Sequence, residues 1–127
     1  MKKGFLPPLA VLAAVLAFCL WNSAAMSAAS LRWRDQLQRA GILAQDENWS
    51  AVQTVLQESY RDWSDYQTYL HIVTGHGTVD EAEILYRRCA AFAGIQEGGE
   101  FQVELAGLRE QLRLLAEMER FSIRNVL

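Results

Sequence analysis

The chain has 127 residues, which is enough for one domain and not for two. Lys and Arg number 12 against 15 Asp and Glu, so the formal net charge is −3. An acidic chain with scattered arginines lacks the clustered basic face that nucleic-acid binding requires, so no nucleic-acid partner is expected. Its hydrophobic content of 51% excludes a disordered chain.

The N-terminal segment reads as a membrane anchor. Lys2 and Lys3 precede an uncharged stretch over residues 4–31, which is apolar as far as Trp21 and then rich in small residues. About 20 apolar residues in a helix cross a bilayer, and a tryptophan favours its interface. We therefore expect residues 5–29 to lie in the membrane, with an anchor or signal segment over 1–30 and a separate domain over 31–127.

A cleavable signal peptide remains the alternative for this segment, since a basic start, an apolar core and small residues are its features. Cleavage would follow Ala25 or Ala29 and release a secreted domain. A lipoprotein at Cys19 is disfavoured because the bulky Phe18 precedes it. Signal-like segments usually keep their basic end inside, so the domain is expected outside the cytoplasm, held at the cell membrane by a single span.

Residues 31–127 show helical periodicity and no strand-like alternation. The first stripe runs over 31–44, where it could simply continue the membrane helix. A second stripe runs over 47–73, as one helix or two with a kink, with Asp46 as its N-cap and a stop at Gly75–Gly77. Thr78 and Glu81 form a capping box for the next helix, which ends before a loop over 94–99. The apolar positions of the four helical stretches are Trp33, Leu37, Ala40 and Ala44; Trp49, Val52, Leu56, Ser59, Trp63, Tyr66, Leu70 and Val73; Ala82, Leu85, Tyr86, Cys89, Phe92 and Ala93; and Phe101, Leu105, Leu108, Leu112 and Leu115.

These stripes predict an all-α protein, in which an N-terminal transmembrane or signal helix precedes an antiparallel bundle of three to four helices. No second copy of any segment is found at a fixed period, so a repeat array is not expected.

Residues suited to catalysis or metal binding are sparse. The two histidines, His71 and His76, are five residues apart and do not share a helical face. No metal-ligand spacing, nucleophile motif or phosphate loop is found, and Cys19 and Cys89 do not form a disulfide framework. We expect no enzyme activity, no metal and no cofactor.

The aromatic residues give the remaining candidates for a binding site. Trp49 and Trp63 lie on one stripe with several tyrosines nearby, and aromatics at this spacing either build a core or line a groove for a peptide or an apolar ligand. Trp49, Trp63 and His76 are therefore the candidate contact or pocket residues.

The order of features resembles a known family. It consists of the lysine-led apolar start, Glu47-Asn48-Trp49-Ser50-Ala51, Trp63, and His76 before Val79-Asp80-Glu81-Ala82-Glu83. Glu104-Leu105-Ala106-Gly107-Leu108 and the closing Ser122-Ile123-Arg124-Asn125-Val126-Leu127 follow. The chain thus resembles the bacterial family called domain of unknown function 4363, small membrane-anchored helical proteins found largely in Bacillota. The resemblance implies a topology and no activity.

Together these features predict a membrane protein whose domain is an interaction or scaffolding module that binds a protein partner or itself. A ligand-sensing module and a secreted bundle are the alternatives.

Overall fold

The computed structural model describes residues 2–67, 70 and 76–126. Of the side chains within these ranges, those of residues 2–6, 76, 122, 123, 125 and 126 lie outside the description. Four long helices are defined: α1 (Lys2–Gln45), α2 (Trp49–Asp65), α4 (His76–Gly94) and α5 (Gly98–Val126). The described ranges contain no strand, and the predicted all-α bundle is confirmed.

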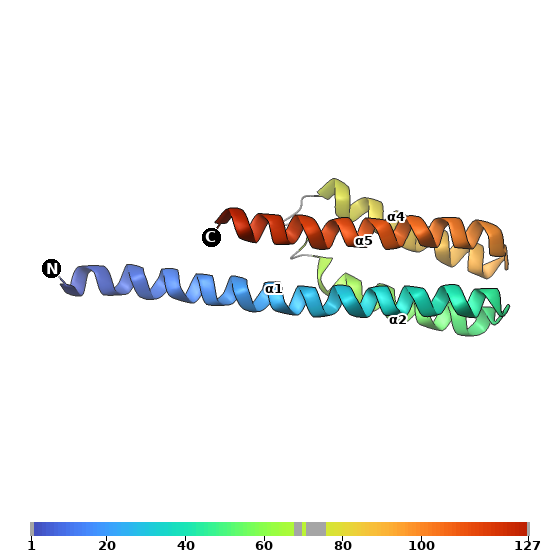
Figure 1. Ribbon diagram of the computed structural model, residues 1–127, viewed down its shortest axis with the longest axis horizontal. Helices are drawn as coiled ribbons and strands as arrows, with labels where there is room; N and C mark the ends of the chain where they lie inside the picture. Colours follow the sequence, from blue (N-terminus) through green and yellow to red (C-terminus); the bar gives the residue numbers. More distant parts are fainter. Residues whose placement is uncertain (1, 68–69, 71–75, 127) are drawn as a thin grey trace.

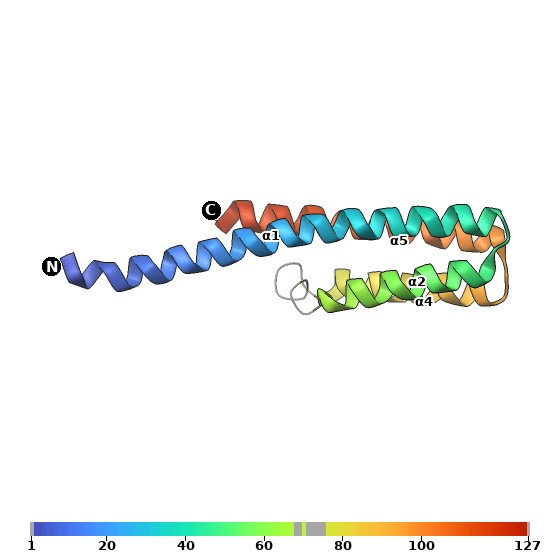
Figure 2. The same ribbon diagram turned by 90° about the horizontal axis from the view of Figure 1, so that it is seen from below.

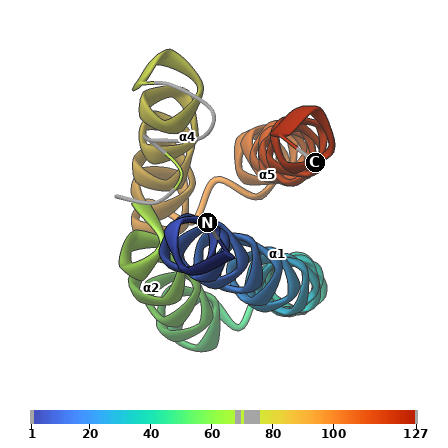
Figure 3. The same ribbon diagram turned by 90° about the vertical axis from the view of Figure 1, so that its left-hand side faces the viewer.

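The helices run up and down in an antiparallel bundle. Figure 1 shows that the α1–α2 and α4–α5 turns share one end of the molecule, while α1 continues past every other helix at the opposite end. Figure 2 shows the same extension of α1 from a perpendicular direction. Viewed end on, α1 neighbours α2 and α5, and α4 completes the four corners (Figure 3). The bundle is therefore two helical hairpins packed on each other.

Helix α1 combines the apolar N-terminal segment and the first bundle helix without a break. The boundary that the sequence suggested after residue 30 falls within this helix of 44 residues. Its side chains over residues 7–21 are mostly exposed, with Trp21 70% exposed, and burial begins at Met26 and Ala29. A helix with this length and composition qualifies as a membrane span, as the core helix of a soluble protein or a signal sequence also would.

The predicted core positions of the bundle are buried. Trp33, Leu37 and Ala40 of α1 face the core, together with the α5 seam from Phe101 to Leu115. The α4 residues of the predicted stripe are buried except Phe92, which is half-buried against the core. The period of the apolar residues therefore identified the inner faces of the helices correctly.

Both hairpins turn with the same backbone geometry. In the first, the amide of Glu47 bonds to the carbonyl of Ala44 at 3.0 Å, and that of Asn48 to the carbonyl of Leu43 at 2.9 Å. Glu47 lies in the left-handed region with φ 59°. These bonds define a Schellman motif, which satisfies the last carbonyls of α1 and usually places glycine at the left-handed residue.

The second turn repeats this pattern 49 residues later. Gln96 also has φ 59°, and the amides of Gln96 and Glu97 bond to the carbonyls of Ala93 and Phe92. Buried residues of the two hairpins follow the same spacing: Trp33 and Ala82, Leu37 and Tyr86, Ala40 and Cys89, Ala44 and Ala93, Val52 and Phe101, Leu56 and Leu105, Ser59 and Leu108, and Trp63 and Leu112. The two hairpins thus share the geometry of their turns and the spacing of their buried residues. Few of these pairs are identical, and so no repeat was visible in the sequence.

Three predicted helix ends are wrong. The N-cap of α2 is Asn48 and not Asp46, because the Asn48 side chain accepts the amide of Ala51 at 3.4 Å while Asp46 still belongs to the turn. Helix α4 begins at His76, so Thr78 lies in its first turn and is not its cap. Gly98 and Gly99, expected in a loop, open α5.

The second apolar stripe ends earlier than the sequence indicated. Helix α2 stops at Asp65, and Tyr66 caps it, with its amide bonded to the Trp63 carbonyl at 3.0 Å. Helical bonding resumes at Leu70, whose amide bonds to the Tyr66 carbonyl at 2.9 Å. His71 and Val73 lie outside the described residues.

Candidate functional site

The most site-like feature of the bundle is a groove of about 460 Å³ between α2 and α4, which we call the α2–α4 groove. One wall comes from successive turns of α2 and the other from α4, and its lining residues are Gln53, Leu56, Gln57, Tyr60, Tyr86, Arg87 and Ala90. The small side chain of Ala90 leaves room between the helices. The groove therefore presents an apolar base with amide, phenol and guanidinium groups around it.

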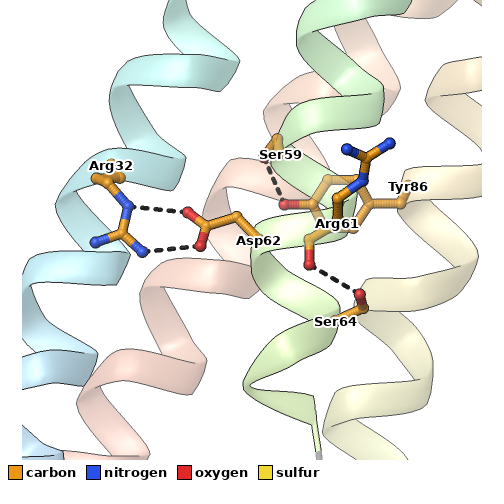
Figure 4. Close-up of polar contacts among 6 residues, drawn as sticks. All are labelled: Arg32, Ser59, Arg61, Asp62, Ser64 and Tyr86. Carbon is orange, nitrogen blue, oxygen red and sulfur yellow. Dashed lines mark hydrogen bonds and ion pairs between the residues drawn. The ribbon is translucent and has the colours of Figure 1, made fainter.

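Tyr86 is held in place from the opposite helix. Its hydroxyl lies 2.8 Å from the Ser59 hydroxyl, and both side chains are buried (Figure 4). Burial raises the pKa of Tyr86, so the phenol is neutral at physiological pH. The bond satisfies two polar groups that would otherwise cost free energy in the core, and it joins α2 to α4.

A second polar chain lies beside the groove. The Tyr60 hydroxyl donates to Glu83 Oε1 at 2.9 Å, and Arg87 Nη2 bonds to the same oxygen at 3.1 Å. The hydrogen bond to Glu83 raises the pKa of Tyr60, as does burial. Glu83 is thus engaged by two donors, and the exposed guanidinium of Arg87 remains at the groove edge.

The two tyrosines of the groove rest on Trp63. The ring centroid of Trp63 lies 5.9 Å from that of Tyr60 and 5.3 Å from that of Tyr86, and the two tyrosine rings meet edge to face at 5.5 Å. Aromatic pairs at these separations add about 0.5–1.5 kcal/mol beyond their burial. Trp63 is fully buried, so it supports the lining without belonging to it.

The structure does not bring the three sequence candidates together. Trp49, half-buried at the start of α2, packs edge to face on Phe101 at 5.7 Å, whereas Trp63 lies near the other end of that helix. Neither tryptophan lines the α2–α4 groove. His76 is the first residue of α4, and its side chain lies outside the described residues.

Of the residues that do line the groove, only Leu56 and Tyr86 belonged to the predicted stripes, as core positions. Ser59 was the one available signal, because a serine at an apolar position needs a buried hydrogen-bond partner. The sequence could not indicate that this partner is Tyr86, since the pairing depends on how α2 and α4 are aligned.

A second groove, of about 470 Å³, lies between α1 and α5 on the other side of the molecule. Arg34 of α1 and Arg109, Arg113 and Arg120 of α5 line it. Arg113 is paired with Glu110 and Glu117, and the bond to Glu110 raises its pKa. These exposed pairs contribute little to stability. Because Arg34, Arg109 and Arg120 line the groove in addition to Arg113, the groove has an excess of positive charge.

One further ion pair connects the first hairpin. Arg32 of α1 bonds through two nitrogens to both carboxylate oxygens of Asp62 on α2, at 2.9 and 2.8 Å (Figure 4). The bond to Asp62 raises the pKa of Arg32. It links α1, just beyond the apolar segment, to the C-terminal part of α2.

The groups that line the α2–α4 and α1–α5 grooves are suited to binding. They offer phenols held neutral, amides, guanidinium groups and apolar surface. Among the described residues, no three His, Cys, Asp or Glu side chains converge as a metal site would require. Burial raises the pKa of the Cys89 thiol to about 12, which makes it a poor nucleophile.

Comparison with known proteins gives one match. The sequence model of a family described as "Domain of unknown function (DUF4363)" matches residues 20–126. No curated protein and no solved structure matches the chain. The matched region begins within the apolar segment and extends nearly to the end of α5.

Proposed function

Since the chain belongs to the DUF4363 family, whose description assigns no activity, we propose a function from its geometry: a single-pass membrane protein whose bundle is a protein-interaction or scaffolding module without catalytic activity. The continuity of α1 carries this proposal. One helix includes the uncovered apolar segment and the core residues Trp33 and Leu37, with no linker between them. An anchor joined in this way holds the bundle at a set height and direction, as a scaffold requires.

The proposed topology places the bundle outside the cytoplasm at the cell membrane. Lys2 and Lys3 at the short end favour the inside, in the manner of signal-like segments. The bilayer is one partner, and a protein partner or a second copy is the other; nucleic acid is not, given the acidic composition.

The intact mass of the protein recovered from its host tests the anchor. We expect a full-length mass in the membrane fraction. A soluble product that begins at Met26 or Ser30 would support the secreted alternative instead. Cleavage after Ala29 would also remove Met26 and Ala29 from the core, so retention agrees better with their burial.

Site-specific photo-crosslinking in the host tests the interaction role. A crosslinker at Gln57, in the α2–α4 groove, is compared with one at Gln38, an exposed position on α1. Adducts with one defined protein at Gln57 but not at Gln38 would support the proposal. Equal adducts at both sites, or none at any exposed position, would contradict it.

The α2–α4 groove favours one second candidate, a ligand-binding module. Its volume and its mixed apolar and phenolic lining suit a small amphipathic molecule. A ligand that raises the melting temperature of the wild type should have no effect on Ala90→Trp, which fills the groove. Ala91→Trp is the matched control, because Ala91 is an exposed neighbour outside the lining. Stabilisation that survives in Ala90→Trp would exclude this groove as the site.

A further inference from the structure

The C-terminal end of α5 extends beyond the four-helix part of the molecule. Helix α4 begins at His76, and Gln111 Nε2 bonds to the Thr78 carbonyl at 3.1 Å, so α5 passes the start of α4 near residue 111. Beyond that point α5 continues to Val126 along α1 (Figure 1). This two-helix stem points toward the apolar end of α1.

The register between α1 and α5 shows how far the stem reaches. Gly41 of α1 lies beside Gln102 and Leu105 of α5. The Gln102 Nε2 donates to the Gly41 carbonyl at 3.0 Å, and a Cβ added to Gly41 would lie 3.1 Å from Leu105 Cδ2. Both helices rise about 1.5 Å per residue. Trp21 is twenty residues before Gly41 on α1. Because α5 runs antiparallel, the level of Trp21 is reached about twenty residues after Gln102 and Leu105, near Arg124.

The burial of α1 agrees with this register. Met26 and Ala29, within the segment expected to lie in the bilayer, are covered by protein. The part of α1 left for lipid is about residues 4–22, which at 1.5 Å per residue is still close to the thickness of a hydrocarbon core. The family match starts at residue 20, close to this limit.

The outer surface of the stem is amphipathic. Leu114, Met118 and Phe121 form an exposed apolar stripe on α5, with Phe121 63% exposed. Arg120 and Arg124 are exposed on the same final turns, and no ion pair among the described residues includes either one. Apolar and aromatic side chains beside arginines are the composition of a helix end that lies in a membrane interface.

We infer that the C-terminal turns of α5 form a second membrane contact, in which Phe121 and Met118 enter the headgroup layer beside Trp21 and the arginines Arg120 and Arg124 bind anionic lipid phosphates. This inference rests on the proposed membrane anchor. In this arrangement the contact of α5 adjoins the membrane-spanning part of α1. The edge of the bilayer then lies at about Trp21 and not at residue 29, as the sequence suggested. The bundle would then stand on two helices and could not rotate freely about α1.

Depth-dependent fluorescence quenching tests this contact in the full chain reconstituted into vesicles. An environment-sensitive fluorophore is attached to a single cysteine in a Cys19→Ser background. Cys89 can remain, because it is fully buried and its thiol pKa is raised. The labelled variants are Phe121→Cys, Val103→Cys and Ala14→Cys.

Val103 is the matched control for Phe121, since it is 70% exposed on the same helix and lies near the turn that is distant from the membrane. We expect shallow spin-labelled lipids to quench the label at position 121 and to leave position 103 as emissive as in water. Deep quenching at position 14 reports the anchor. Deep quenching at position 14 with no quenching at 121 would refute this inference alone; no quenching at either would refute the anchor as well.

Lipid charge provides the second measurement. Each arginine near an anionic surface favours the docked state about fivefold. The quenched and unquenched fractions of the label at position 121 report how much of the protein has α5 docked on the membrane. In vesicles that contain phosphatidylglycerol, the double variant Arg120→Gln/Arg124→Gln should therefore lower the ratio of docked to undocked protein by about 25-fold. In pure phosphatidylcholine the two proteins should behave alike. Equal quenching of both proteins in anionic vesicles would overturn the role of the arginines.

Discussion

Replacement of Trp63 by alanine tests whether this residue is a core support or a surface contact. Its ring is fully buried, and it packs on Tyr60 and Tyr86 at centroid distances of 5.9 and 5.3 Å. Removing a buried tryptophan to alanine costs about 3–5 kcal/mol, which includes the lost contacts and the cavity that remains. A domain is stable by only about 5–15 kcal/mol, so a loss of about 3–5 kcal/mol means that Trp63→Ala should remove about a fifth or more of its stability.

A second substitution separates packing from hydrogen bonding at this position. The indole Nε1 of Trp63 is buried without a hydrogen-bond partner among the described residues. A buried N–H without a hydrogen-bond partner lowers the stability of the folded state by about 1–3 kcal/mol. Phenylalanine has no such N–H but keeps an aromatic ring. We therefore expect Trp63→Phe to change the free energy of unfolding by no more than about 1 kcal/mol, because the smaller ring and the lost unpaired group offset each other.

Denaturant unfolding of the full chain in detergent micelles, followed by far-ultraviolet circular dichroism, measures these differences. The apolar segment stays helical in the micelle, so the change in signal reports the bundle. Trp49→Ala is the control, since the half-buried Trp49 should cost about 1–3 kcal/mol. A cost below about 1 kcal/mol for Trp63→Ala, or one smaller than that of Trp49→Ala, would refute the assignment of Trp63 to the core.

Three further measurements test the turns, the titration of the core and the α5 seam. Glu47→Gly and Gln96→Gly, both at left-handed residues, should each raise the free energy of unfolding by up to about 1 kcal/mol; a loss in denaturant unfolding would contradict the strain at these turns. The thiol pKa of Cys89 rises from 9.0 to about 12 on burial, so its contribution is complete below pH 9 and is lost as the pH rises toward 12. Between pH 8 and 10.5 the wild type should lose about 2 kcal/mol more than Cys89→Ala, and equal losses would show that the thiol is not buried. Leu112→Asp should unfold the bundle, because an unpaired charge in the core costs several kcal/mol; a normal melting curve would place Leu112 on the wrong face.

The chain determined its helices and their buried faces locally. Apolar residues three and four positions apart share one side of a helix, so the core stripe of α5 from Phe101 to Leu115 could be predicted without knowing its neighbours. The all-α class and the family resemblance followed from the same information. Helix ends were less certain, because the caps depend on single hydrogen bonds, such as that from the Ala51 amide to Asn48.

Contacts between helices were decided by the tertiary structure alone. The pairing of Ser59 with Tyr86, the groove beside them and the separation of Trp49 from Trp63 depend on the alignment of α2 with α4 and α5, which the turns and the whole core set together. The covering of Met26 by protein in a segment composed like a membrane span has the same origin. A residue's spacing determines the face of the helix on which it lies, but only the register between helices determines what that face meets.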